Sequence, residues 1–222
     1  MRGQRVVPVL LATLMAGCAS TPEAPWHSLA EAGQWRSVGA SALDARWQVR
    51  DGELVLIAAG GGDIISVDTY GDFELEWEWR VQLGGNSGLF YRAVDASPIW
   101  ARAVEYQLLD DRAAEDRIVP SHRAAAVYDL VAPARDVLRP LGEYNHARIV
   151  ACGPRVTHWL NGVRVATYDL DSDDWKRRVA ASKFADQAEF ARARRGHLGL
   201  QDHGNAVYLR NMRIRALGRS CS

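Results

Sequence analysis

Apolar and polar residues alternate with a period of two through most of this chain, and this pattern restricts its fold more than any other feature. The clearest run is 73–81, where the odd positions are apolar, mostly aromatic, and the even positions are glutamate or arginine. Successive side chains of a β-strand point to opposite faces, so each run predicts a half-buried strand. Shorter runs of the same kind lie at 89–92, 105–108, 198–203 and 207–214.

Turn signals separate these runs in the way that antiparallel hairpins require. Asp51-Gly52 and Asn161-Gly162 each lie between two alternating segments, which predicts two tight hairpins of type I′. One helical stretch is expected at about 173–194, with acidic residues at its start and arginines at its end. No strand–helix–strand rhythm is present. The prediction is one all-β domain over 35–218, built as a two-sheet sandwich.

The first residues predict a targeting segment. Residues 1–17 combine an early basic part with a short apolar stretch, as in a signal peptide. The following Leu14-Met15-Ala16-Gly17-Cys18 resembles the lipobox of bacterial lipoproteins, which implies lipidation of Cys18 and a tether over 18–34. Ala19 after the cysteine favours an outer-membrane lipoprotein that faces the periplasm. The alternative is an ordinary secretory signal with an unrelated cysteine nearby.

Charge and cysteine content exclude several classes of protein. Lysine plus arginine equals aspartate plus glutamate, 27 against 27, and loss of 1–17 leaves 25 − 27 = −2, so no nucleic-acid partner is expected. Three cysteines are too few for a disulfide-dense scaffold or a four-cysteine zinc site. Cys152 and Cys221 could pair in an oxidising periplasm or remain separate. No P-loop, nucleophile elbow or zinc-protease motif is present, and no metal site is predicted.

The polar side of the strands is the candidate site. Its members mix carboxylates, arginines, amides and a histidine, which suits a polyhydroxylated ligand, although any sandwich has a solvated sheet face. Gly88 and Gly199 are expected to leave room above it. We expect these residues on one concave sheet face, with Trp77 and Trp79 buried behind it: Glu76, Glu78, Arg80, Arg92, Glu105, Gln107, Gln201 and His203.

Ordered segments of the chain resemble one known family, the 3-keto-disaccharide hydrolase domain family. They are Asp72-Phe73-Glu74-Leu75, Glu78-Trp79-Arg80, the stretch 85–92, the stretch 105–110, the stretch 158–162, Ser182-Lys183-Phe184 and the stretch 196–204. The resemblance spans roughly 35–217 and implies a concanavalin-like jelly roll that acts on sugars oxidised at C3. Residues 112–125 depart from the family pattern, which leaves the choice of substrate open.

A ketone at C3 acidifies the C2 proton, so a 3-keto-glycoside can be cleaved by elimination and rehydration. We expect Glu105 as base, His203 as acid and Arg92 at the developing enolate, with Glu105 and His203 exchangeable. A two-carboxylate glycosidase mechanism would instead use Glu105 with Glu78. Residues expected to contact substrate are Gln107, Gln201, Glu78, Arg80, Asn86, Asp110 and Lys183.

The implied chemistry needs no cofactor, and assistance by a divalent metal stays open. The partners expected are a sugar substrate, an upstream sugar 3-dehydrogenase and the membrane that holds the lipid anchor. Two other classes of function remain as alternatives: a lectin-like lipoprotein that holds glycan without chemistry, and a purely structural lipoprotein.

Overall fold

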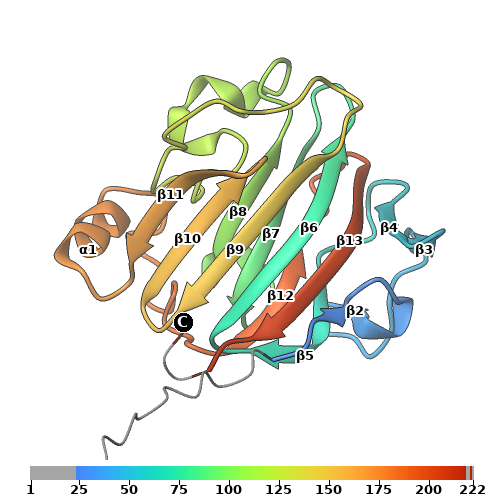
Figure 1. Cartoon of the computed structure of the whole chain (residues 1–222), viewed down its shortest axis with the longest axis horizontal. Helices are drawn as coiled ribbons and strands as arrows, with labels where there is room; N and C mark the ends of the chain where they lie inside the picture. The colour runs from blue at the N-terminus through green and yellow to red at the C-terminus, as the bar shows by residue number, and fades with distance from the viewer. Residues whose placement is uncertain (1–23, 219–220, 222) are drawn as a thin grey trace, which may run out of the picture.

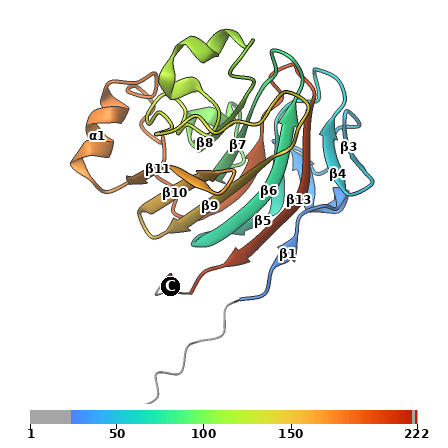
Figure 2. The ribbon, with the colours of Figure 1, turned by 45° about the horizontal axis from the view of Figure 1, so that its top comes forward.

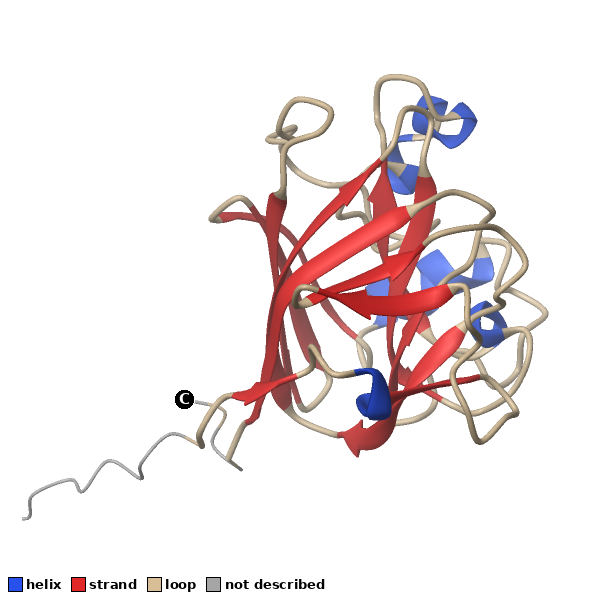
Figure 3. Cartoon of the chain, turned by 90° about the vertical axis from the view of Figure 1, so that its right-hand side faces the viewer, coloured by secondary structure: helices blue, strands red, loops and turns tan. Residues whose placement is uncertain are grey.

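A computed structural model describes residues 24–218 and 221, which form two antiparallel sheets packed face to face. Figure 1 shows one sheet in front of the other, and Figure 3 shows the helical segments gathered to one side of the strands. The larger sheet has the order β11 (Val163–Asp169), β10 (Arg155–Leu160), β9 (Asn145–Cys152), β6 (Phe73–Val81), β13 (Val207–Ala216), β4 (Glu53–Leu56), β3 (Trp47–Arg50), with β1 (His27–Ser28) beside β13. The smaller sheet has the order β2 (Trp35–Ser37), β5 (Ile64–Tyr70), β12 (Gly196–Leu200), β7 (Asn86–Ala93), β8 (Val104–Leu109).

The core lies between the two sheets, where the predicted apolar parity is buried. Trp77 and Trp79 of β6 are almost fully buried, as expected. The Trp77 ring meets the ring of Tyr106, which comes from β8 of the opposite sheet, edge to face at 4.9 Å between centroids. The all-β sandwich prediction is confirmed. No helix among the described residues is both long and apolar enough to cross a membrane.

Both predicted hairpins form with the expected backbone. Asp51 and Gly52 have φ of 51° and 78° between β3 and β4, and Asn161 and Gly162 have φ of 50° and 79° between β10 and β11. Positive φ at both central residues defines the I′ turn, whose twist matches that of the flanking strands. Asx-Gly is favoured there because these residues tolerate that conformation best.

The helical prediction was too long. Only Asp173–Ala180 is α-helical (α1), beside edge strand β11 in Figure 1, and 181–195 is mostly turns. Ser172 caps α1 by accepting from the Trp175 N–H, and the stacked rings of Trp175 and Phe190 help hold the turns after the helix. The later arginines belong to those turns, so a basic end to the segment did not mark the end of a helix.

The packed domain also begins earlier than expected. β1 lies within the predicted tether and pairs with β13, as Figure 2 shows, and a short 3₁₀ helix (Ala32–Gln34) follows it. Leu29 is buried in the core. The predicted signal peptide and the lipidation residue Cys18 lie outside the described residues.

Cys152 and Cys221 form a disulfide with Cα atoms 5.6 Å apart, so the pairing that the sequence left open is made. The bridge ties the C-terminal segment to β9 and joins residues separated by 69 positions. A cross-link of this span stabilises the fold mainly by restricting the unfolded chain.

We therefore expect Cys152→Ser with Cys221→Ser to lower the free energy of unfolding by about 2 kcal/mol. Urea unfolding followed by tryptophan fluorescence measures the effect. Wild type treated with reductant under native conditions serves as the matched control and should show the same loss. Equal stability of the bridged and unbridged proteins would contradict this prediction.

Candidate active site

The expectation of one polar face is wrong, because the strands that carry it belong to different sheets. Glu76, Glu78 and Arg80 lie on β6 in the eight-stranded sheet, whereas Glu105 and Gln107 lie on β8 in the five-stranded sheet. Residues of one parity point away from the core in both sheets. The alternation therefore identified the outward-facing residues of both sheets, and the prediction wrongly placed them on a single face.

The β6 face is a ladder of ion pairs. Its pairs join β6 to β13 and β9 and are Glu74 with Arg148 and Arg215, Glu76 with Arg213, and Glu78 with Arg210. Arg80 lies over the rings of Tyr144 and Tyr208. Because Glu78 and Glu105 are on opposite sides of the sandwich, they cannot flank one glycosidic bond as the two-carboxylate mechanism requires.

Glu105 is the central residue of the other outer face. In the β7–β8 pairing Glu105 is opposite Phe90 and Gln107 is opposite Gly88, so both side chains leave the sheet on the side away from the core. The carboxyl of Glu105 lies over Gly88: a Cβ placed on Gly88 would stand 2.0 Å from Oε1. Gly88 therefore makes room for Glu105 itself, and Gly199 makes room for Ile99, rather than for a ligand as expected.

Burial perturbs the Glu105 carboxyl strongly. Only 5% of the residue is exposed, and desolvation raises its pKa from the ordinary 4.5 to about 8. The charge of Lys183 lowers this pKa, and the charges of Asp63 and Asp116 raise it further. A raised pKa was expected for Glu105 from its apolar neighbours, and burial shifts it in that direction. Such a group can exchange protons near neutral pH, as an acid–base catalyst must.

This pKa makes folding stability depend on pH. Below pH 4.5 both folded and unfolded chains hold the Glu105 proton, so no stability is lost; between pH 4.5 and about 8 only the unfolded chain releases it. We expect Glu105→Gln, which has no such proton, to gain stability relative to wild type by on the order of 4 kcal/mol as the pH rises through this window. Urea unfolding at pH 4.5 and pH 8 measures the difference. A constant difference would show that the folded pKa is ordinary.

Two amides connect Glu105 to a second carboxyl. The side-chain amide of Gln107 lies 3.0 Å from Glu105 Oε1 and 3.2 Å from Asn86 Oδ1. Asn86 Nδ2 in turn lies 3.2 Å from Asp116 Oδ2. Gln107 and Asn86 are buried, so the row runs from the sheet to the loop between β8 and β9. Both amides were expected at the site.

The loop 110–131 and the turns after α1 add charged and aromatic groups. Tyr128 donates to Asp116 Oδ2 at 3.3 Å and stacks on His122 with centroids 4.3 Å apart. The ammonium of Lys183 lies 4.2 Å from the centre of the Tyr128 ring and 5.1 Å from that of Trp100. Lys183 is thus brought to the site, as expected.

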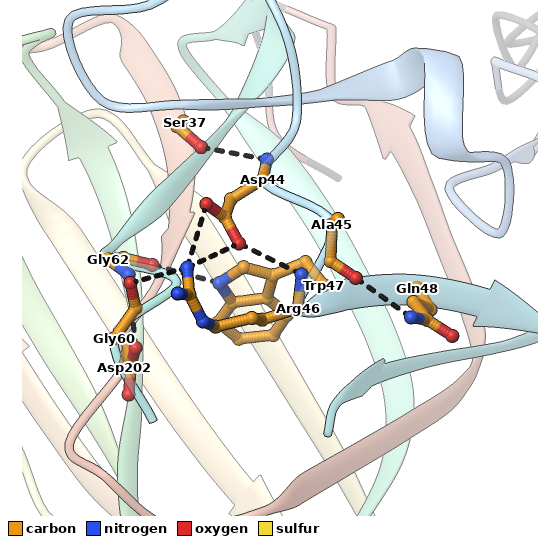
Figure 4. Close-up of polar contacts among 9 residues, drawn as sticks. All are labelled: Ser37, Asp44, Ala45, Arg46, Trp47, Gln48, Gly60, Gly62 and Asp202. Atoms are coloured by element: carbon orange, nitrogen blue, oxygen red, sulfur yellow. Dashed lines mark hydrogen bonds and ion pairs between the residues drawn. The ribbon is translucent and has the colours of Figure 1, made fainter. Parts of the chain in front are cut away.

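A carboxylate and histidine cluster lies at the β5 side. Asp202 accepts from the Gly62 N–H at 3.0 Å, as Figure 4 shows, and its own N–H donates to Asp63 Oδ1. Burial raises the pKa of Asp63, and the nearby charge of His203 lowers it. His203 is exposed and follows the end of β12. The charge of His203 acts on Asp63, and the charge of Asp63 acts on Glu105.

Arg92 is held elsewhere, which corrects its expected position beside Glu105. It has a φ of 53° next to an irregularity in the β7–β12 pairing, and it is only 4% exposed. Its guanidinium donates to Gly71 O, Gly153 O and Asp72 Oδ1 and so joins the two sheets. This ion pair, in which Arg92 is buried and Asp72 is partly exposed, is structural.

Of two further expected residues, Asp110 binds backbone groups with its side chain, whereas Gln201 is held by its own backbone N–H. Asp110 is buried and accepts from the N–H groups of Gly84 and Arg112. Gln201 uses its own backbone N–H to reach Gly88 O, and its side chain is half-buried beyond β12. Asp110 therefore shapes the turn before β7 and does not face the site.

Sequence reasoning missed Asp63, Asp116, His122 and Tyr128. All four lie outside regular strands, so the alternation that identified Glu105 gave no signal for them. The one available signal for Asp116 and His122 was the departure of 112–125 from the family pattern.

Comparison with known proteins finds a match over most of the described chain. The model of the 3-keto-alpha-glucoside-1,2-lyase-like domain matches residues 25–215. A Bacteroides thetaiotaomicron protein named 3-keto-disaccharide hydrolase is 32% identical over 216 residues, covering 82% of this chain and 74% of that protein.

Solved structures agree with the architecture. A predicted glycosyl hydrolase of Parabacteroides distasonis superposes with a TM-score of 0.80 at 27% identity, covering 87% of this chain and 94% of its own. A Bacillus subtilis protein with a galectin-like fold superposes with a TM-score of 0.58 at 13% identity, covering 86% and 94%, a likeness of fold alone.

Proposed function

This chain belongs to the 3-keto-alpha-glucoside-1,2-lyase-like domain family and is an enzyme that acts on carbohydrate, and we propose that it cleaves 3-keto-glycosides at the outer face of the five-stranded sheet. The observation that carries the proposal is the buried carboxyl of Glu105 with the ammonium of Lys183 close enough to perturb it. A base and a cation in one site are what proton removal next to a ketone needs.

The reaction has two stages. The base takes the C2 proton while the C3 oxygen gains enolate character; the C1–O bond then breaks, and the leaving oxygen receives a proton. This stage leaves an enone between C1 and C3. Water then adds its oxygen to C1 and a proton to C2, so the sum of both stages is hydrolysis.

Glu105 is the base in this scheme, because a carboxyl with a pKa of about 8 holds an abstracted proton better than an ordinary glutamate. Lys183 takes the role at the C3 oxygen that the sequence had given to Arg92. His203 remains the candidate acid for the leaving oxygen, since its exposed imidazole can carry and donate a proton. Gln107 and Gln201 remain candidates for binding ring hydroxyls.

The substrate test compares a chromogenic 3-keto-α-glucoside with the unoxidised α-glucoside of the same leaving group. We expect release of the chromophore from the first only. Binding of either sugar without turnover would instead establish the lectin-like alternative. Equal cleavage of both sugars would contradict a mechanism that depends on the ketone.

Lys183→Met should lower kcat on the 3-keto-glucoside about 10- to 100-fold, because the developing enolate loses its cation. The chain has a matched control in Lys176→Met, since Lys176 is an exposed lysine of α1 that pairs with Asp173 of its own helix. We expect Lys176→Met to keep wild-type activity. Equal kcat values for the two variants would remove Lys183 from the mechanism.

We also propose an upstream enzyme that makes the substrate and a membrane location for the protein. The ketone at C3 must come from an oxidation of the sugar, so a sugar 3-dehydrogenase is the expected upstream enzyme. We propose that the chain is lipidated at Cys18 and held at the outer membrane facing the periplasm. Metabolic labelling with an alkynyl fatty acid should mark wild type and leave Cys18→Ala unlabelled; label on both would contradict the anchor.

A further inference from the structure

Glu105, Gln107, Asn86 and Asp116 form an unbroken row of hydrogen-bond distance contacts. The row has a carboxyl at each end and two primary amides between them, with separations of 3.0, 3.2 and 3.2 Å. An amide has one end that donates and one that accepts, so two linked amides must point the same way along the row.

The two amides can be oriented in two ways along the row, and each orientation fits one proton placed on one of the two carboxyls. When Gln107 donates to Asn86 and Asn86 donates to Asp116, the carbonyl of Gln107 faces Glu105 Oε1, and a hydrogen bond there requires a proton on Glu105. When both amides are reversed, Gln107 donates to Glu105, and the carbonyl of Asn86 faces Asp116. That contact requires a proton on Asp116.

We propose that Glu105 and Asp116 share one proton, and that the Gln107–Asn86 amide pair couples their protonation by reversing its direction. With both carboxyls ionised, one carbonyl must face a carboxylate oxygen in either direction, so that state is disfavoured. No proton passes through an amide; each amide only rotates.

The coupling fits the proposed reaction and makes Asp116 a positioning residue for it. The Ser87 carbonyl, 3.0 Å from Gln107, accepts from Gln107 in the direction in which Gln107 also donates to Glu105, and this direction accommodates Glu105 as an ionised base. When Glu105 takes the substrate C2 proton, the amides reverse and Asp116 releases its own proton to water. The Asp116 side chain is 34% exposed, so it has access to water that Glu105 lacks.

Other charged groups act on the two ends. Lys183 and Asp63 act on Glu105 through space, and Asp116 faces His122 at 3.5 Å and the hydroxyl of Tyr128. Asp63 is useful as a reference, because its charge raises the pKa of Glu105 and it is not part of the amide row. A through-space effect and a coupling through the amides can therefore be separated.

The experiment is a double-mutant cycle read from the side-chain carbonyl ¹³C shift of labelled Glu105, assigned by its absence in Glu105→Gln. Asp116→Asn places a third amide at this end, which can donate to or accept from Asn86, so ionised Glu105 no longer forces a carbonyl against a carboxylate. We expect it to lower the pKa of Glu105 by about one pH unit or more, and by less than about 0.3 when Asn86→Leu has broken the row.

The control is Asp63→Asn, whose effect on the Glu105 pKa should be the same in the wild-type protein and in the Asn86→Leu variant. An Asp116→Asn effect that survives Asn86→Leu undiminished would overturn the proposal and leave only through-space repulsion. Asn86→Ser serves in place of Asn86→Leu if the latter does not fold. The titration needs no turnover, so this result stands apart from the test of the proposed activity.

Discussion

Replacing Glu105 with glutamine is expected to lower kcat on a 3-keto-glucoside about a thousandfold or more, the range that loss of a positioned general base produces. Glutamine keeps the size of the side chain and can still meet the Gln107 amide, so the fold and the surroundings of the site should persist. The loss then reports the missing proton acceptor. Initial rates with purified protein, together with far-UV circular dichroism, provide the measurement.

Glu78→Gln is the matched control for this variant. It makes the same chemical change on the outer face of the other sheet, where Glu78 pairs with Arg210. We expect Glu78→Gln to keep wild-type kcat. A loss as large as that of Glu105→Gln would reinstate the two-carboxylate mechanism, and full activity in Glu105→Gln would remove Glu105 as the base.

Gly88→Ala is expected to lower kcat about a hundredfold, because the added Cβ would stand 2.0 Å from Glu105 Oε1 and 2.6 Å from its Cδ. The carboxyl must move, and misplacement of a catalytic group by about 1 Å can cost a factor of that size. Side-chain displacement on an outer face leaves the core between the sheets in place. Activity should therefore fall much more than stability.

Gly199→Ala is expected to have the opposite effect, with stability falling more than activity. Its Cβ would meet Ile99 Cδ1 at 2.4 Å and Phe90 Cβ at 3.2 Å, both apolar groups, and none of the three atoms nearest to it belongs to Glu105. We expect a loss of about 1–3 kcal/mol in unfolding free energy from overpacking, with kcat of the folded fraction near wild type. Equal losses of activity in the two alanine variants would show that Gly88 has no special relation to Glu105.

Strands and hairpins were predictable because their signals are local. Alternation in 73–81 and the two Asx-Gly turns depend on neighbouring residues alone, and each appears in the structure as expected. The assignment of strands to sheets was not predictable in this way. β6 and β7 follow one another along the chain, yet they enter different sheets, and parity says only which side of a strand faces the core.

The site was predictable only where it lies on a strand. Glu105 and Gln107 follow the alternation of β8 and share one outer face. Arg92 breaks the rule because its positive φ and the pairing irregularity beside it turn the side chain toward the junction of the sheets. Asp116 and Tyr128 reach Glu105 from a loop, and loop positions depend on tertiary contacts that no periodicity records.

The most direct test of the central claim is a kinetic isotope effect at C2. A 3-keto-α-glucoside carrying deuterium at C2 is mixed with excess wild-type enzyme, and cleavage is followed in a single turnover, so that product release cannot mask the chemical step. If Glu105 removes the C2 proton, the deuterated substrate reacts severalfold more slowly than the protonated one. Equal single-turnover rates for the two substrates would contradict elimination and the role given to Glu105.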